Sequence, residues 1–302
     1  MKVTRREIVC AMAALVAPVE IGVSAVPRLR LAICNETFAP LNFAEACRVA
    51  KQAGFAGLEV APFTLGDDPA AIARAGRAEL RDAMKFSGLD YVGLHSLLTA
   101  PNGLHVTAPD EAVRRKSWDY VRRLVDLSAD LGSPSVMVFG SGKQRSAVAG
   151  LAIADAVKRF TDGLAEVAPA AEARRVTILI EPLSPQFSNV INTLDEAVAL
   201  VGQINSPAIS AMFDTHNTVA EKAPHGELIK KHRQYIRHVH LNEMDGRHPG
   251  TGNYDFTSVL RALREISYRG WVSVEIFDFT PGGERIARES ARFIRQLEAK
   301  LK

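Results

Sequence analysis

Three acidic residues and one histidine in the second half of the sequence each lie at the end of a short apolar segment. They are Glu181, Asp214, His240 and Glu275. Three carboxylates that meet in one place repel one another and shift one another's pKa unless a cation lies between them. One imidazole and three carboxylates suit a divalent ion such as Mn²⁺, Mg²⁺, Co²⁺ or Zn²⁺. Taken singly, each residue could equally be a solvated loop residue or part of a rim ion pair. The prediction therefore depends on a fold that brings all four together.

Further polar side chains lie at or after other apolar segments and are candidates for contacting a substrate. Glu59 and His95 belong to the second and third segments, and His216 and Asn217 follow Asp214 closely. A carboxylate or imidazole at such a place can bind a hydroxyl group or relay a proton. Each of them could instead bond to the backbone or form an ion pair with a neighbouring loop.

Eight apolar segments alternate with eight amphipathic ones. The expected strands span residues 29–34, 57–60, 91–95, 135–139, 176–181, 209–213, 236–241 and 271–276. The expected helices span residues 42–53, 70–87, 110–131, 148–173, 193–203, 227–232, 256–266 and 284–301. Continuously apolar strands are typical of a parallel sheet that helices cover. Eight such units predict an α/β fold, a single (β/α)8 TIM barrel, whose active-site residues come from the carboxyl ends of the strands. An open, doubly wound sheet is the alternative, but no Gly-x-Gly-x-x-Gly motif follows the first strand.

The first 26 residues have the layout of an export signal. Arg5 and Arg6 precede an apolar stretch that is too short to span a bilayer, and Val23-Ser24-Ala25 ends the segment with small residues. The adjacent arginines resemble a twin-arginine signal; a frayed N-terminal helix is the alternative. We predict an export signal over residues 1–26, expected to be cleaved, and a barrel over residues 27–302. The expected location is periplasmic or otherwise exported, or cytoplasmic if the signal does not function.

The charge and the cysteine count exclude several classes of protein. With 37 Lys and Arg against 34 Asp and Glu, the net charge is +3, and no run of five basic residues occurs. Nucleic acids and anionic membranes require concentrated positive charge, so neither is an expected partner. Three cysteines are too few for a disulfide framework or a cysteine-rich zinc site. A small-molecule substrate is the expected partner, and the sequence leaves room for a homo-oligomer.

Several short motifs carry a family resemblance. They are Ile180-Glu181-Pro182-Leu183, Phe213-Asp214-Thr215-His216-Asn217, His238-Val239-His240-Leu241-Asn242-Glu243, Pro249-Gly250-Thr251-Gly252 and Val274-Glu275. With them, the chain from about residue 29 to residue 301 resembles the sugar phosphate isomerase/epimerase family of xylose isomerase-like TIM barrels. The resemblance implies one divalent metal ion bound by the four residues named first. In the ketose 3-epimerases of this family the two ligand glutamates are also the acid/base pair, which implies catalytic roles for Glu181 and Glu275.

The reaction that the resemblance implies is isomerisation or epimerisation of an unphosphorylated sugar, keto-sugar or cyclitol. A carboxylate removes the proton next to the carbonyl and another returns it, while the metal ion stabilises the enediolate. The chain departs from the ketose 3-epimerases at three sugar-binding positions. Phe187 stands where they have a glutamate, Gly246 where they have an arginine, and Asn217 where they have a histidine. Arg247, one residue displaced, and His216 are the candidate substitutes.

Three other functions remain open at this stage. The first is a lyase or dehydratase that acts on a keto-inositol or a 3-keto-glycoside. The second is an AP endonuclease-like hydrolase, which would need a cluster of zinc ions; after His240 the chain offers only Asp245 and His248 as extra ligands. The third is a barrel that binds a carbohydrate without turning it over. The metal content separates them, since a single ion, a multinuclear cluster and a metal-free chain are the respective expectations of the isomerase, the hydrolase and the binding protein.

Overall fold

The apolar segments form eight parallel strands that close into one barrel. A computed structural model describes residues 28–301. Each strand pairs with the next in chain order, and β8 returns to β1. The strands are β1 (Arg30–Cys34), β2 (Gly57–Val60), β3 (Asp90–Leu94), β4 (Ser135–Phe139), β5 (Val176–Ile180), β6 (Ile209–Asp214), β7 (Ile236–Leu241) and β8 (Trp271–Val274). The closed order confirms the predicted (β/α)8 barrel and excludes the open, doubly wound sheet.

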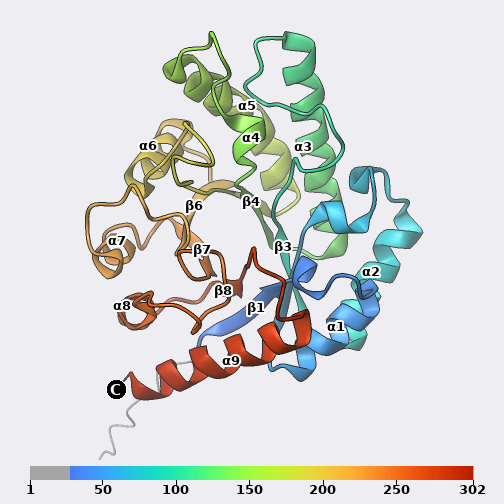
Figure 1. Ribbon diagram of the computed structural model, residues 1–302. Coiled ribbons are helices and arrows are strands. Elements are labelled where there is room, and N and C mark those ends of the chain that lie inside the picture. The colour runs from blue at the N-terminus through green and yellow to red at the C-terminus, as the bar shows by residue number, and fades with distance from the viewer. Residues whose placement is uncertain (1–27, 302) are drawn as a thin grey trace, which may run out of the picture.

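Helices follow the strands and surround the barrel (Figure 1). The α-helices are α1 (Phe43–Gln52), α2 (Arg74–Phe86), α3 (Glu111–Leu131), α4 (Gly142–Arg145), α5 (Ile153–Ala173), α6 (Leu194–Ile204), α7 (His225–Lys231), α8 (Phe256–Glu265) and α9 (Gly283–Lys300). Three short 3-10 helices are η1 (Asn35–Phe38), η2 (Pro62–Leu65) and η3 (Pro69–Ala71). The predicted export signal lies outside the described residues. Within residues 28–301, every helix is too short or too polar to cross a membrane.

The ends of the helices follow local capping signals. The side chain of Asn42 accepts a hydrogen bond from the backbone of Glu45, and the Glu45 carboxylate accepts one in return, which forms a capping box at the start of α1. Thr193 and Glu196 form the same arrangement at α6. Two predicted helices begin later than expected. Residues 69–71 form a separate 3-10 turn before α2, and Gly150, at φ +83°, belongs to a turn before α5.

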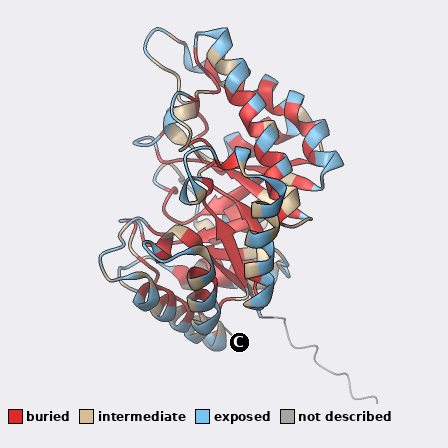
Figure 2. Ribbon diagram, turned by 90° about the vertical axis from the view of Figure 1, so that its right-hand side faces the viewer, coloured by how far each residue is buried: buried red, intermediate tan, exposed pale blue. Residues whose placement is uncertain are grey.

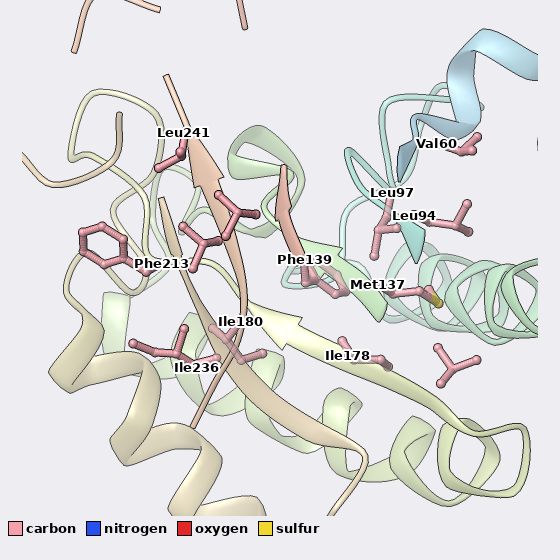
Figure 3. Close-up of a cluster of buried hydrophobic side chains, with 14 of the residues drawn as sticks. Val60, Leu94, Leu97, Met137, Phe139, Ile178, Ile180, Phe213, Ile236 and Leu241 are labelled. Atoms are coloured by element: carbon pink, nitrogen blue, oxygen red, sulfur yellow. The ribbon is translucent and has the colours of Figure 1, made fainter. Parts of the chain in front are cut away.

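The main hydrophobic core lies between the barrel and its helices. Met137, Phe139, Ile178 and Ile180 contribute to it from β4 and β5 (Figure 3). Because successive strand residues point to opposite faces, Val138 on β4 points the other way. It belongs to a second, separate cluster with neighbouring strand residues. The strands are largely buried, apart from Arg30, Asp90 and Arg237, whereas the outer faces of the helices are exposed (Figure 2).

The interior of the barrel also contains a buried polar network. Glu59 on β2 contacts His238 and His240 on β7. These two strands are not neighbours in the sheet, so the contacts cross the inside of the barrel. The interior therefore combines an apolar cluster with charged side chains, and the charged part lies below the mouth where the predicted site residues gather.

Candidate functional site

Four side chains converge at the carboxyl ends of β5, β6, β7 and β8. They are Glu181, Asp214, His240 and Glu275, called here the ligand cluster; one nitrogen or oxygen atom from each lies within 4.8 Å of the others. Glu181 directly follows β5, and Glu275 directly follows β8. Asp214 ends β6, and His240 lies on β7 in register with Asp214. All four are buried. The structure thus brings together the four residues that the sequence predicts as metal ligands.

The carboxylates of the ligand cluster disturb one another. Burial raises the pKa of Glu181, and the nearby Glu275 and Asp214 raise it further. Burial followed by Glu275 also raises the pKa of Asp214. Burial opposes ionisation of Glu275 as well, but His240 outweighs it and holds the pKa of Glu275 below its usual value. A divalent cation among these oxygens would relieve the repulsion, because it neutralises the charge that burial leaves unsolvated.

The orientation of His240 fits such a cation. Its Nε2 lies 3.0 Å from Glu59 Oε1, so the ring donates its proton to a buried carboxylate on the far side from the cluster. Its Nδ1 lies 3.0 Å from Glu275 Oε2 and has no hydrogen-bond partner within residues 28–301. A histidine that gives one N–H to a carboxylate and aims its other nitrogen at a group of carboxylates is arranged as a metal ligand. The donor set present therefore suits a divalent ion.

Asn217 links two members of the ligand cluster. Its Nδ2 donates to Asp214 Oδ2 at 2.6 Å and to Glu181 Oε1 at 3.2 Å. Its Oδ1 accepts a hydrogen bond from the backbone of Ser184. The amide is buried and uses its polar atoms within the protein, so Asn217 positions the two carboxylates. The structure gives Asn217 a supporting role, and its contact with a substrate stays a prediction.

Glu59 and His95 are both buried, and each contacts a member of the ligand cluster. Glu59 is 0% exposed, and both of its oxygens contact histidines of β7. Burial raises the pKa of Glu59, but His238 and His240 outweigh this and hold it well below its usual range. The physical reason is that residue 59 lies within β2 and points into the barrel. Glu59 thus orients His240, and its contact with a substrate stays a prediction.

His95 lies among three carboxylates. Its Nε2 is 2.7 Å from Glu36 Oε1 and 3.8 Å from Glu275 Oε1, and its Nδ1 is 3.5 Å from Glu59 Oε1. Burial lowers the pKa of His95, but Glu36 and the other two carboxylates together raise it to about 9. The ring is 0% exposed and lies against a carboxylate of the ligand cluster, and its role as a substrate or proton-relay group stays a prediction. Glu36 follows the first apolar segment by two residues and is not among the candidates predicted from the sequence. Its carboxylate is the closest partner of His95.

Two residues that the sequence does not single out fix the position of Glu181. Arg145 on α4 is completely buried, and its guanidinium donates to the carbonyl oxygens of Phe139 and Glu181, both at 2.7 Å. Gly140 follows β4, and a Cβ atom at this position would lie 2.2 Å from Glu181 Oε2. Glycine is therefore required for the close approach of this carboxylate.

Two predicted substrate contacts remain, His216 and Arg247. His216 lies beside the ligand cluster, whereas Arg247 forms no hydrogen bond with the cluster within residues 28–301. The backbone N–H of His216 donates to Asp214 Oδ1 at 2.9 Å. Arg247 forms an ion pair with Asp245 at 2.8 Å, and its side chain is 43% exposed. The displaced arginine is thus paired within its own loop.

A comparison with known families agrees with this fold. The family model described as xylose isomerase-like TIM barrel matches residues 47–297, most of the chain. The chain belongs to the xylose isomerase-like TIM-barrel family. The resemblance that the sequence motifs indicate is thereby confirmed.

The curated relatives of this xylose isomerase-like chain include sugar epimerases. An L-ribulose 3-epimerase of Mesorhizobium japonicum is 29% identical over 66% of this chain and 67% of its own length. A ketose 3-epimerase of Arthrobacter globiformis is 28% identical over 57% of this chain and 59% of its own length. Among solved structures, the apo form of 3-keto-D-glucoside 4-epimerase from E. coli has a TM-score of 0.78 at 20% identity and covers 89% of this chain and 100% of its own. At that identity the structural likeness establishes the fold.

Proposed function

We propose that this chain is a divalent-metal-dependent epimerase or isomerase of an unphosphorylated sugar, keto-sugar or cyclitol. The observation that carries the proposal is the ligand cluster, in which three carboxylates and one imidazole meet within 4.8 Å at the ends of four consecutive strands. The likeness to L-ribulose 3-epimerase and ketose 3-epimerase supports epimerisation as the reaction. One bound ion per chain, Mn²⁺, Mg²⁺, Co²⁺ or Zn²⁺, is part of the proposal.

Glu181 and Glu275 are the proposed acid and base. They leave β5 and β8, with β6 and β7 between them, so their carboxylates approach a substrate from different directions. One carboxylate takes the proton from the carbon next to the carbonyl, and the other delivers a proton to the opposite face, which inverts that carbon. The bound ion would polarise the carbonyl and stabilise the charge that develops on its oxygen.

The surrounding residues prepare these two carboxylates for proton transfer. Arg145 and Asn217 hold Glu181 from its backbone and its side chain. His240 faces Glu275 through Nδ1, and His95 lies 3.8 Å from it. Glu181 is 5% exposed and Glu275 is 6% exposed, so both carboxylates are largely withdrawn from water but can still exchange their protons with solvent between turnovers.

The test is exchange of the substrate proton in D₂O. The metal-loaded protein is incubated with D-psicose, L-ribulose, inososes and 3-keto-glycosides, and NMR monitors deuterium at the carbon next to the carbonyl while chromatography identifies the product. We expect exchange together with an epimer or isomer, and loss of both after treatment with a chelator. Glu275→Gln is expected to lower turnover by about 10³-fold, because one acid/base group is worth about 10²–10⁴-fold and a ligand is lost with it. Glu172→Gln, an exposed change on α5, is the matched control.

Each other outcome contradicts the proposal in a different way. Exchange accompanied by loss of water or of an aglycone would identify a lyase. Cleavage of abasic DNA with several zinc ions per chain would identify a hydrolase. Sugar affinity in a metal-free protein without exchange would identify a binding protein.

A further inference from the structure

An aromatic rim stands beside the ligand cluster. It consists of Phe187, His216 and Phe277. The His216 ring stacks on Phe187, with centroids 5.5 Å apart and planes 29° apart, and also contacts Phe277 at 5.0 Å and 40°. Phe187 follows Glu181 by six residues, while His216 and Phe277 each follow a ligand carboxylate by two. Each of the three loops that begin at a carboxylate of the cluster therefore contributes one ring.

The two phenylalanines of the rim are unusually open for residues of their size. Phe187 is 44% exposed and Phe277 is 53% exposed, whereas His216 between them is buried. Met244, on the loop after β7, is also exposed and accepts a hydrogen bond from Thr218 through its sulfur atom. Grouped apolar surface next to a buried polar site is typical of a ligand-binding groove rather than of scattered surface residues.

Backbone contacts hold the rim in place. The N–H of Phe277 donates to the carbonyl of Gly246 at 2.8 Å. Gly246 has φ +81°, and a Cβ atom there would lie 3.0 Å from the Cβ of Phe277, so glycine allows the loop after β7 to pack on this ring. Phe187 closes a turn by donating its N–H to the carbonyl of Ser184. Because main-chain hydrogen bonds already hold the loops of the rim, binding a ligand against its rings costs little conformational entropy.

His216 adds a polar atom between the two rings. Its Nδ1 lies 3.2 Å from the carbonyl oxygen of Glu243, an acceptor, so Nδ1 carries the proton. Nε2 is then an acceptor, and no hydrogen bond within residues 28–301 occupies it. Flat apolar faces flanking one hydrogen-bond acceptor suit a ring that has C–H or aryl faces and hydroxyl groups at its edge. A short open-chain polyol presents no such face.

We infer that the aromatic rim is a subsite for a second ring, and that the substrate is a keto-sugar joined to a ring-shaped substituent rather than a free ketose. This inference rests on the proposed function and specifies its substrate. Either a second sugar ring or an aryl group provides the required face. The keto-sugar occupies the ligand cluster, and the substituent lies against Phe187 and Phe277 with a hydroxyl group near His216 Nε2.

The test compares three 3-keto-glucosides that differ only in the group on the anomeric oxygen: methyl, phenyl and glucosyl. Proton exchange in D₂O gives kcat/KM for each with the metal-loaded protein. We expect kcat/KM to be at least about tenfold higher for phenyl, glucosyl or both than for methyl, because burial of a ring against aromatic faces adds binding energy in the transition state. The phenyl and glucosyl arms distinguish an aryl aglycone from a second sugar.

Variants assign the preference to the rim. Phe187→Ala and Phe277→Ala are expected to lower the ratio of ring-bearing to methyl kcat/KM by at least about fivefold, and Phe187→Leu is expected to lower it in part, since leucine keeps apolar volume without a flat face. Phe86→Ala, at a 96% exposed position on α2, is the matched control and leaves the ratio unchanged. Equal kcat/KM for the three glucosides, or alanine variants that keep the wild-type ratio, would overturn the inference while leaving the proposed function intact. Failure of all three glucosides to exchange, while D-psicose, L-ribulose or an inosose does exchange, would also overturn the inference. Failure of every one of these substrates would instead overturn the proposed function.

Discussion

The ligand cluster and the aromatic rim lie next to each other but are built in opposite ways. Residues of the cluster lie on strands or immediately after them, and each is buried and bonded to a named partner. Residues of the rim lie two to six positions farther along, in loops, and two of the three are half exposed. Sheet register therefore determines where the cluster stands, whereas loop conformation determines where the rim stands. The reaction and the choice of substrate can then vary separately on one barrel.

The difference also has an energetic side. The cluster collects like charges in a place without water, and this is unfavourable unless fixed donors and a cation compensate it. Its supports consequently form a second layer of buried polar residues, with Glu59 and His95 below and Arg145 and Asn217 beside. The rim needs no such layer, since its rings are apolar and carry no charge. We expect substitutions to affect stability at the cluster and mainly specificity at the rim.

The largest effect on stability is expected at Arg145. Its guanidinium donates to the carbonyls of Phe139, Glu181, Val190 and Ile191. Burial lowers the pKa of this residue to about 10, so it remains charged at neutral pH. Arg145→Met leaves buried carbonyls without donors, at about 1–3 kcal/mol each, and the free energy of unfolding should fall by about 3 kcal/mol or more. Urea denaturation measures it. A loss below about 1 kcal/mol would show that the loop after β5 does not depend on this side chain.

A smaller effect, on turnover rather than folding, is expected at Gly140. Alanine would place its Cβ 2.2 Å from Glu181 Oε2, so the carboxylate must move by about 1 Å, which costs on the order of 10²-fold in rate. The rate at which the substrate proton exchanges in D₂O measures the proton transfer by Glu181. Gly202→Ala is the control, because a Cβ there meets nothing within 4 Å. Gly202 lies in the last turn of α6, so the change should leave turnover unchanged and stabilise the protein by up to about 1 kcal/mol. Unchanged exchange in Gly140→Ala would mean that Glu181 does not need its observed position.

The smallest effect on stability is expected at the rim. Phe187→Ala removes a half-exposed ring. The free energy of unfolding should therefore change by no more than about 0.5 kcal/mol, as for a typical surface substitution. Differential scanning calorimetry of the metal-free and metal-loaded proteins measures it. A loss of several kcal/mol would show that the ring is part of the core and would remove the contrast between the two regions.

The strands and the residues of the ligand cluster could be predicted from the sequence, because both depend on short-range patterns. Apolar segments locate the strands, and the barrel rule then brings their ends together, as with Asp214 and His240. Side-chain direction was not predictable to the same degree: Glu59 belongs to the same strand pattern but points down into the barrel. Arg145 was missed because its acceptors are backbone carbonyls up to 46 positions away, which no local motif reveals. The pairing of Arg247 with Asp245 likewise depends on the shape of one loop.

The hydrogen bond between Phe277 and Gly246 has a consequence for engineering. Because the loop after β8 is fastened to the loop after β7 through main-chain atoms, the two form one exchangeable module rather than two. A chimera that imports only the segment after β7 from a related barrel would disturb this contact, since a residue other than glycine at position 246 would meet the Phe277 side chain. Loop grafting to redirect specificity should therefore transfer both segments together and leave the strands as they are.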